Sequence, residues 1–440
     1  MLQDKSFCEN RNFTFDHLYF FMTTIITNIK QLVNVRTENK LLRGSELANL
    51  PIIDNAYLVV QDGLIKNFGE MKKLSTVDSL QLTENIIDSS GATILPTYCD
   101  SHTHIVFAAS RESEFVDKIN GLTYADIAAK GGGILNSANK LANTSEEDLY
   151  NLAYKRLQEV IKLGTGAIEI KSGYGLSVDA EIKMLRVIKE LKKNAGIPIK
   201  STFLGAHAFP IQYKENKQAY VNLILKDMLP TIEKENLADY IDAFCEQGFF
   251  DIAQTETICK AGINAGLKVK IHANQLSSTG AVQLGVKLNA LSVDHLEIMD
   301  DDAIKSLASS NTIGTLLPTA AFFLRMHYQP ARQLIDAGCA IALASDFNPG
   351  SSPSGNMNFV NAVSCIQMKM LPEEVINAST INGAFAMEVE NEVGSISVGK
   401  KANLIFTKDI PSLAYLPYSF GSNLIDKVMI NGVFMNQNNS

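Results

Sequence analysis

Short apolar runs alternate with longer amphipathic stretches through the middle of the chain, from about residue 91 to residue 390. The longer stretches carry apolar residues at helical spacing, as at 145–163 and 180–193, and Ser145 followed by two glutamates is typical of a helix start. We expect strands at the apolar runs, which are 92–95, 165–170, 197–204, 240–245, 267–271, 290–293, 312–317 and 339–344. About eight such strand–helix units predict an α/β protein built on a (β/α)8 TIM-like barrel.

Both ends of the chain show a different pattern, in which short strands and turns take the place of helices. Residues 57–60 and 64–65 flank Asp62-Gly63, which predicts a β-hairpin with a tight turn. Near the other end, 427–430 precede Asn431-Gly432 in the same style. We therefore expect one small β-sandwich domain made from both termini. The predicted divisions are an N-terminal extension at 1–22, the first part of the sandwich at 23–90, the barrel at 91–390 and the second part of the sandwich at 391–440.

The composition of the 440 residues fits an ordinary globular protein, with 46% apolar and 20% charged residues. A net charge of −8 argues against nucleic acid as a partner, because such binding needs a basic face. We see no apolar run of about 18 residues, which argues against a membrane span. The six cysteines are scattered with no CxxC pair, which predicts reduced, mostly buried thiols in a cytoplasmic protein.

The segment Cys99-Asp100-Ser101-His102-Thr103-His104 carries the first candidate chemistry. Alternate side chains of a strand point to the same face, so His102 and His104 are placed to hold one metal ion. In a parallel barrel the active site lies at the C-terminal ends of the strands. Four further polar residues end or follow an apolar run, namely His207, His272, His295 and Asp346. We therefore expect these side chains to converge at one rim of the barrel, whereas His17 and His327 lie elsewhere.

His102, His104 and His272 offer three neutral imidazole ligands, and Asp346 adds a carboxylate. This set suits one divalent or trivalent metal ion, zinc or iron. The cysteines do not cluster with these residues, so we expect a catalytic site with an open position for water and not a structural zinc site. Such an ion lowers the pKa of a bound water from about 15.7 towards about 7. We expect Asp346 to take the proton of the water as it attacks a carbon of C=O or C=N character, and His295 either to share this work or to polarise a carbonyl oxygen.

Two alternatives stay open on the residues alone. Lys171 lies near the predicted barrel mouth, where a carboxylated lysine can bridge two metal ions; we favour a mononuclear site, because no further ligand for a second ion is evident. A lone histidine at a strand end is more often structural than catalytic. A non-enzymatic scaffold with a vestigial site is therefore the second alternative, and metal analysis separates it from an enzyme.

The pattern Asp100-x-His102-x-His104, with a histidine after the fifth and after the sixth strand and an aspartate after the eighth, resembles the amidohydrolase superfamily. Further motifs, from about residue 25 to the end of the chain, are similar to the imidazolonepropionase family within it. They are Glu169-Ile170-Lys171-Ser172-Gly173-Tyr174-Gly175, Phe203-Leu204-Gly205-Ala206-His207, Phe244-Cys245-Glu246, Ser345-Asp346-Phe347-Asn348-Pro349-Gly350 and Tyr418-Ser419-Phe420-Gly421-Ser422-Asn423. The resemblance implies that water opens the imidazolone ring of 4-imidazolone-5-propanoate at its cyclic amide C–N bond, in L-histidine degradation. The product is N-formimidoyl-L-glutamate, and the family implies a homodimer.

The same resemblance implies a set of substrate contacts. Arg111 matches an arginine that meets the substrate, and a guanidinium binds a carboxylate in two parallel hydrogen bonds, so the propionate group is its expected partner. Without the resemblance, a surface charge is the better interpretation of Arg111. Tyr174 and His207 match contacts to the ring or to the carboxylate. The loop after the eighth run supplies the remaining matches, Asn348, Gly350 and Ser351.

One residue departs from the family pattern. A glutamate often stands three residues after the third metal-binding histidine, and here that residue is Gln275. A glutamine cannot move protons but donates and accepts hydrogen bonds. We therefore expect Gln275 to orient the substrate ring, and we assign proton transfer to Asp346 and His295. The alternative function is a deaminase or another cyclic amidohydrolase on the same barrel, and the glutamine at 275 argues against the deaminase.

Overall fold

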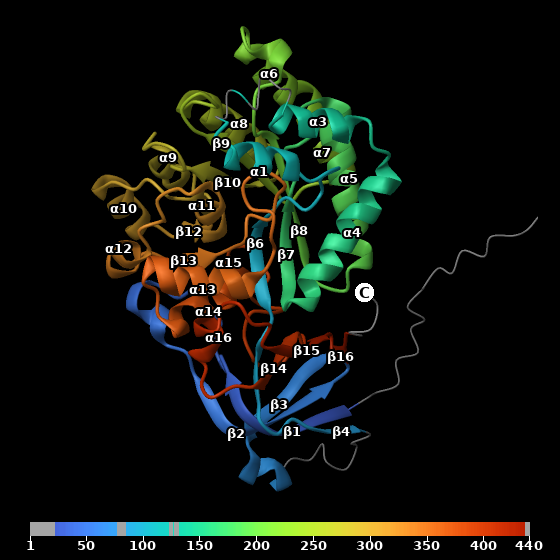
Figure 1. The fold of residues 1–440 in the computed structure, drawn as a ribbon, viewed down its shortest axis with the longest axis vertical. Helices are drawn as coiled ribbons and strands as arrows, with labels where there is room; N and C mark the ends of the chain where they lie inside the picture. Colours follow the sequence, from blue (N-terminus) through green and yellow to red (C-terminus); the bar gives the residue numbers. More distant parts are fainter. Residues whose placement is uncertain (1–22, 77–84, 123–125, 127–131, 436–440) are drawn as a thin grey trace, which may run out of the picture.

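A parallel barrel and a separate sheet make up the computed structural model, which describes residues 23–76, 85–122, 126 and 132–435 (Figure 1). Eight parallel strands follow one another round the barrel in sequence order. They are β6 (Tyr98–Thr103), β7 (Thr165–Lys171), β8 (Ile199–Ala206), β9 (Tyr240–Cys245), β10 (Lys268–Ala273), β11 (Ser292–His295), β12 (Ile313–Leu316) and β13 (Ile341–Leu343). A backbone bridge between Thr103 and Phe347 joins the first strand to the segment after the last. The predicted (β/α)8 TIM-like barrel is confirmed.

Helices surround the barrel strands (Figure 1). The start predicted at Ser145 is confirmed, because its hydroxyl accepts a hydrogen bond from the backbone N–H of Asp148 at 3.0 Å and so caps the next helix. The helices are α1 (Glu112–Ile119), α3 (Ile134–Ala142), α4 (Glu146–Lys162), α5 (Val178–Asn194), α6 (Lys217–Leu223), α7 (Leu229–Glu235), α8 (Ile252–Asn264), α9 (Ala281–Lys287), α10 (Asp301–Ala308), α11 (Pro318–Leu324), α12 (Ala331–Asp336), α13 (Met357–Met368), α14 (Pro372–Ser379), α15 (Ile381–Phe385) and α16 (Tyr415–Tyr418).

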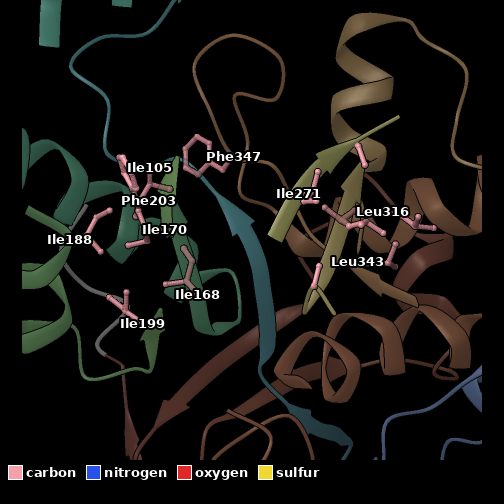
Figure 2. Packing of buried hydrophobic residues seen from close by; sticks show 14 of the residues in the cluster. Ile105, Ile168, Ile170, Ile188, Ile199, Phe203, Ile271, Leu316, Leu343 and Phe347 are labelled. Atoms are coloured by element: carbon pink, nitrogen blue, oxygen red, sulfur yellow. The ribbon is translucent and has the colours of Figure 1, made fainter. Parts of the chain in front are cut away.

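Strand β7 shows how the barrel separates apolar from polar side chains. Ile168 and Ile170 point outward and lie beside Ile188 of α5, within the main hydrophobic cluster (Figure 2). Between and after them, Glu169 and Lys171 occupy the opposite face and are fully buried inside the barrel. The outward face of β7 therefore packs against the helices, and its inward face places charged residues inside the barrel.

The second sheet is built from both ends of the chain, as predicted. Its strand order is β16–β15–β14–β5–β1–β2–β3, with β4 paired to β1 (Figure 1). The strands are β1 (Thr23–Val33), β2 (Ile52–Gln61), β3 (Leu64–Glu70), β4 (Asn85–Asp88), β5 (Ala92–Pro96), β14 (Leu404–Asp409), β15 (Ile425–Ile430) and β16 (Val433–Phe434). The β2–β3 and β15–β16 hairpins turn at Asp62-Gly63 and Asn431-Gly432, whose positive φ angles suit tight hairpin turns.

One predicted strand was assigned to the wrong sheet. The run at 92–95 was expected to be the first barrel strand, but β5 pairs with β1 and β14 in the terminal sheet. The first barrel strand is β6, which holds the polar segment from Cys99 to Thr103. An apolar run buried in a sandwich has the same pattern as one buried in a barrel, so the pattern alone did not separate them. The predicted extension at 1–22 lies outside the described residues, and among those described no helix is long and apolar enough to cross a bilayer.

Candidate metal centre and substrate pocket

Three imidazoles converge at the C-terminal rim of the barrel. His102 and His104 come from the end of β6, and His272 comes from β10. Their ligand atoms lie within 4.8 Å of one another, and all three residues are buried. Asp346, just after β13, places Oδ1 3.6 Å from the Nε2 atoms of both His102 and His104. The structure thus brings together the four residues that the sequence nominated as metal ligands.

The tautomers of these imidazoles fit a metal ion. The Nδ1 atom of His102 lies 2.7 Å from a carboxylate oxygen of Asp294, and that of His272 lies 2.9 Å from Asp242. A hydrogen on Nδ1 leaves Nε2 with a bare lone pair, yet the Nε2 atoms of His102 and His104 face each other at 3.4 Å. Two lone pairs at that distance are compatible with a cation between them. Carboxylates beside Nδ1 of His102 and His272, and the backbone oxygen of Ser172 at 3.4 Å from Nδ1 of His104, are the kinds of partner common at metal sites.

Burial keeps the histidines in the form that binds metals. It lowers the pKa of His102 and of His104 well below the ordinary value, helped by neighbouring positive groups. Both imidazoles are therefore neutral at physiological pH, as coordination requires. Burial also raises the pKa of Asp346 to about 6, although the nearby His295 and His272 oppose the rise.

A buried network of charges lies directly beneath the histidines. Lys171 donates to Glu169 at 2.6 Å and to Asp242 at 2.9 Å, and its ammonium lies 3.5 Å from Asp294. Lys270 pairs with the other oxygen of Glu169. Although burial lowers the pKa of Lys171, the three carboxylates raise it more. Lys171 is thus held by three carboxylates beneath the histidines, and among the described residues the histidine cluster is the one group of three or more side chains placed to hold a metal ion.

Asp242 and Asp294 are residues that the sequence interpretation missed. Asp242 lies in the otherwise apolar strand β9, and Asp294 lies in β11 between Val293 and His295, both with almost no solvent exposure. A charge inside a buried strand is rare unless it is paired. That exception was the signal that could have drawn attention to them.

The backbone on two sides of the site is strained. Asp346 has φ 52° and His295 has φ 86°, conformations that cost energy in residues other than glycine. Asp100 accepts hydrogen bonds from the backbone N–H and the hydroxyl of Ser345 at 2.9 and 2.6 Å. The first residue of the DxHxH motif therefore holds the turn that presents Asp346 to the histidines.

His295 differs from the other histidines of the site in its partner. Its Nδ1 atom lies 3.4 Å from Glu297, and the amide of Gln329 donates to the same carboxylate oxygen at 3.0 Å. Burial lowers the pKa of His295, but Glu297 and the other nearby carboxylates outweigh it, so the pKa lies above the ordinary value. His295 therefore holds a proton more readily than its neighbours, a property suited to proton transfer.

A small pocket opens beside the histidine cluster. It is lined by His104, Tyr174, His207, Phe244, His272, Gln275, His295, Asp346, Asn348 and Ser351. Most of the predicted substrate contacts are thus on its wall. Asn348 is engaged within its own loop, since its amide nitrogen donates to Asp346 O at 2.6 Å and its oxygen accepts from the N–H groups of Gly350 and Ser351 at 2.8 Å.

Arg111 lies next to the pocket wall, 5.7 Å from the centre of the Tyr174 ring. Its Nε atom donates to Ser137 at 2.8 Å, while Nη2 is buried with no hydrogen-bond partner among the described residues. A methyl group at Gly350 would lie 2.5 Å from Nη1, so glycine makes room for the guanidinium. A buried guanidinium nitrogen without a partner fits an anionic group on the substrate.

Comparison with known families agrees with this geometry. The profile of the amidohydrolase family matches residues 93–435, which include the whole barrel. A solved adenosine deaminase from Xanthomonas campestris with bound zinc has a similar fold, at a TM-score of 0.68 and 15% identity, over 94% of this chain and 92% of that chain.

Closer relatives narrow the class. An imidazolonepropionase of Flavobacterium johnsoniae is 57% identical over 93% of this chain and 99% of its own length. An imidazolonepropionase of Christiangramia forsetii is 54% identical over the same shares. The chain therefore belongs to the amidohydrolase family and, within it, to the imidazolonepropionases. The family and the histidine cluster together indicate a metal cofactor.

Proposed function

We propose that this protein hydrolyses the cyclic amide C–N bond of 4-imidazolone-5-propanoate to give N-formimidoyl-L-glutamate, a step of L-histidine degradation. The relatives named imidazolonepropionase support the substrate. The observation that carries the proposal is the combination of a histidine cluster that could hold a metal ion at the pocket with the buried guanidinium nitrogen of Arg111 next to the pocket wall, which has no hydrogen-bond partner among the described residues. A small ring with a carboxylate tail matches both features.

The residues of the pocket divide the work between binding and proton transfer. Arg111 binds the propionate, and Tyr174 and His207 contact the ring. His102, His104, His272 and Asp346 would hold the metal ion, which would supply a water of lowered pKa and a positive charge near the amide carbonyl. Asp346 and His295 accept and return protons, because both are buried on the pocket wall and have pKa values above their ordinary ones.

Gln275 and the loop after β13 complete the proposed site. Gln275 orients the ring through its amide, since it lines the pocket and cannot carry a proton. Asn348 orders the loop that includes Gly350 and Ser351, and Ser351 reaches Asp346 at 3.3 Å. These contacts hold the Asp346 carboxylate in place and keep Asn348 and Ser351 on the wall of the pocket.

We further propose that the ion is zinc or iron, because neutral imidazoles and a carboxylate suit both. A homodimer follows from the family resemblance. A cytoplasmic location fits the five cysteines of the described residues, which are free thiols, four of them buried.

Turnover of freshly prepared 4-imidazolone-5-propanoate tests the function, with the product identified by mass spectrometry and ammonia measured in parallel. The proposal predicts N-formimidoyl-L-glutamate, formed with the addition of one water and without release of ammonia. Ammonia released from a panel of aminated heterocycles, with the imidazolone left intact, would instead indicate a deaminase.

A further inference from the structure

The loop between β7 and α5 brings Tyr174 to the pocket and is held from behind by Glu181. This glutamate lies in the first turn of α5 and has no solvent exposure. Its Oε2 atom accepts a hydrogen bond from the N–H of Gly173 at 3.0 Å. Its Oε1 atom accepts from the N–H groups of Gly175 at 2.7 Å and Leu176 at 3.0 Å. One buried carboxylate thus satisfies three backbone donors of a single loop.

The loop has a conformation that needs outside support. Gly173 has φ 109° and Leu176 has φ 54°, and the left-handed region is unfavourable for a leucine. A methyl group at Gly175 would lie 2.4 Å from the backbone nitrogen of Glu181. The loop therefore lies directly on the start of α5, where the carboxylate can reach its N–H groups, and loss of those bonds leaves three buried donors unpaired.

The same loop determines the orientation of two side chains of the pocket. Gly173 accepts a hydrogen bond at its carbonyl oxygen from Nδ1 of His207, at 3.0 Å. The ring of Tyr174 meets that of His207 edge-on, with ring centres 5.5 Å apart. A shift of this backbone would therefore move both Tyr174 and His207 relative to the substrate.

We propose that Glu181 is a positioning residue for the substrate: it fixes the backbone of residues 173–176 and, through that backbone, orients Tyr174 and His207. Glu181 does not itself line the pocket. The inference rests on the proposed function, because it takes Tyr174 and His207 as contacts of the imidazolone substrate. It adds a residue of α5 that the sequence motifs did not single out.

The substitution Glu181→Gln tests this role in the metal-loaded protein. The glutamine keeps the shape but turns an amide N–H group towards at least one backbone donor. We expect at least tenfold faster hydrogen exchange of the amides of residues 173–176 and at least a tenfold rise in KM, with metal content unchanged and a smaller change in kcat. Glu374→Gln is the matched control, because Glu374 is also buried and accepts the backbone N–H of Leu371 at a helix start. The control should leave KM and the exchange of 173–176 unchanged.

Gly175→Ala disturbs the same contact from the loop side, so a Glu181 variant that fails to fold does not end the test. The proposal is overturned if exchange in the loop is unchanged, if exchange quickens while KM stays the same, or if Glu374→Gln raises KM equally. Exchange needs no substrate. If the wild-type protein does not turn over imidazolonepropanoate, the proposed function fails, and the exchange rates alone then decide whether Glu181 holds the loop.

Discussion

Carboxylates behind the histidines determine which imidazole nitrogen faces the cluster. Asp294 holds Nδ1 of His102 and Asp242 lies beside Nδ1 of His272, while Lys171 lies between the two carboxylates. Asp294 therefore orients the His102 ring through a hydrogen bond, and Asp242 places a negative charge beside the His272 ring. Such partners contribute to metal affinity almost as directly as the ligands themselves.

Asp294→Asn should weaken metal binding about 10–100-fold, because the neutral amide holds the His102 ring less firmly and leaves Lys171 with one fewer charged partner. Competition against a chromophoric chelator measures the affinity. Asp336→Asn on the exposed end of α12 is the control. An affinity within twofold of wild type would show that Asp294 does not orient the ligand.

Arg111→Met should raise KM roughly 10–100-fold and leave the metal content at the wild-type level. The reason is that a hydrogen bond to a charged group is worth about 1.5–3 kcal/mol, and methionine keeps the length of the side chain without its charge. Steady-state kinetics with metal analysis on the same sample separates the two effects. An unchanged KM would remove Arg111 from the propionate site.

Gln275→Glu should give an active protein, with kcat within about tenfold of wild type, if the residue orients the ring and moves no proton. The glutamate has nearly the same shape, so the geometry is retained. The measurement is kcat at saturating substrate, together with bound metal. A variant that keeps its metal but has no activity would contradict the orienting role.

The sequence predicted the residues at the barrel rim better than the buried carboxylates that hold them in position. His207, His272, His295 and Asp346 could be found because each ends or follows an apolar run, and barrel topology then brings those ends together. Glu181 could not, since a single acidic residue on a helix carries no spacing signal, and Asp242 and Asp294 could be noticed only as charges inside buried strands, without any indication of their partners. Their roles depend on partners brought close only by the completed fold.

Among the elements, α4 supports the segment that leads from β6 to Arg111. Arg156 on α4 donates to the backbone oxygens of Ile105 and Phe107 at 2.9 and 2.8 Å, and its guanidinium lies 3.4 Å from the centre of the Phe107 ring. The helix therefore ties down the chain between the metal-binding histidines and the substrate arginine.

Arg156→Met should lower the free energy of unfolding by about 1–3 kcal/mol, because two buried carbonyl groups lose their donor. Arg186→Met is the matched control on α5, since its ion pair with Glu235 is half-exposed and worth about 1 kcal/mol or less. Urea unfolding of the two variants gives the comparison. An equal decrease in the free energy of unfolding of both variants would show that the Arg156 contacts stabilise the fold no more than an exposed ion pair does.

The misassigned run at 92–95 shows what periodicity leaves undecided about elements. Helix starts and hairpin turns depend on local chemistry, as at Ser145 and Asp62-Gly63, and both were predicted correctly. Sheet membership depends on which distant strand a run pairs with. The polar segment that forms β6 was therefore expected to be the end of the run at 92–95, whereas it is a separate strand in the other sheet.

For the molecule as a whole, buried neutral histidines make stability sensitive to acid. In the folded chain the pKa of His207 is about 3, chiefly because of burial, whereas an unfolded histidine titrates near 6.5. His102 and His104 shift in the same direction. Asp100 and Asp346, with pKa values raised by burial to about 7 and about 6, shift in the opposite direction, as do Glu181 and His295, and they offset part of the effect. Each of the three histidines takes up a proton on unfolding below about pH 6.5, so together they lower stability as pH falls.

The melting temperature of the metal-loaded protein should therefore fall between pH 7.5 and pH 5. His207→Gln isolates one contribution: its melting temperature should fall less over the same interval, because the unfolded glutamine takes up no proton. Differential scanning fluorimetry of both proteins at matched metal content measures the difference. Equal slopes would contradict the low pKa of His207.

The most direct test of the central claim is a metal titration of chelator-treated protein, with turnover of 4-imidazolone-5-propanoate followed at each addition of zinc or ferrous iron. Activity should rise in proportion to the metal bound and stop rising at one ion per chain, and His272→Ala should neither retain the ion nor recover activity. Full activity without metal, or a rise that continues to two ions per chain, would contradict a single metal ion held by four residues at the barrel rim.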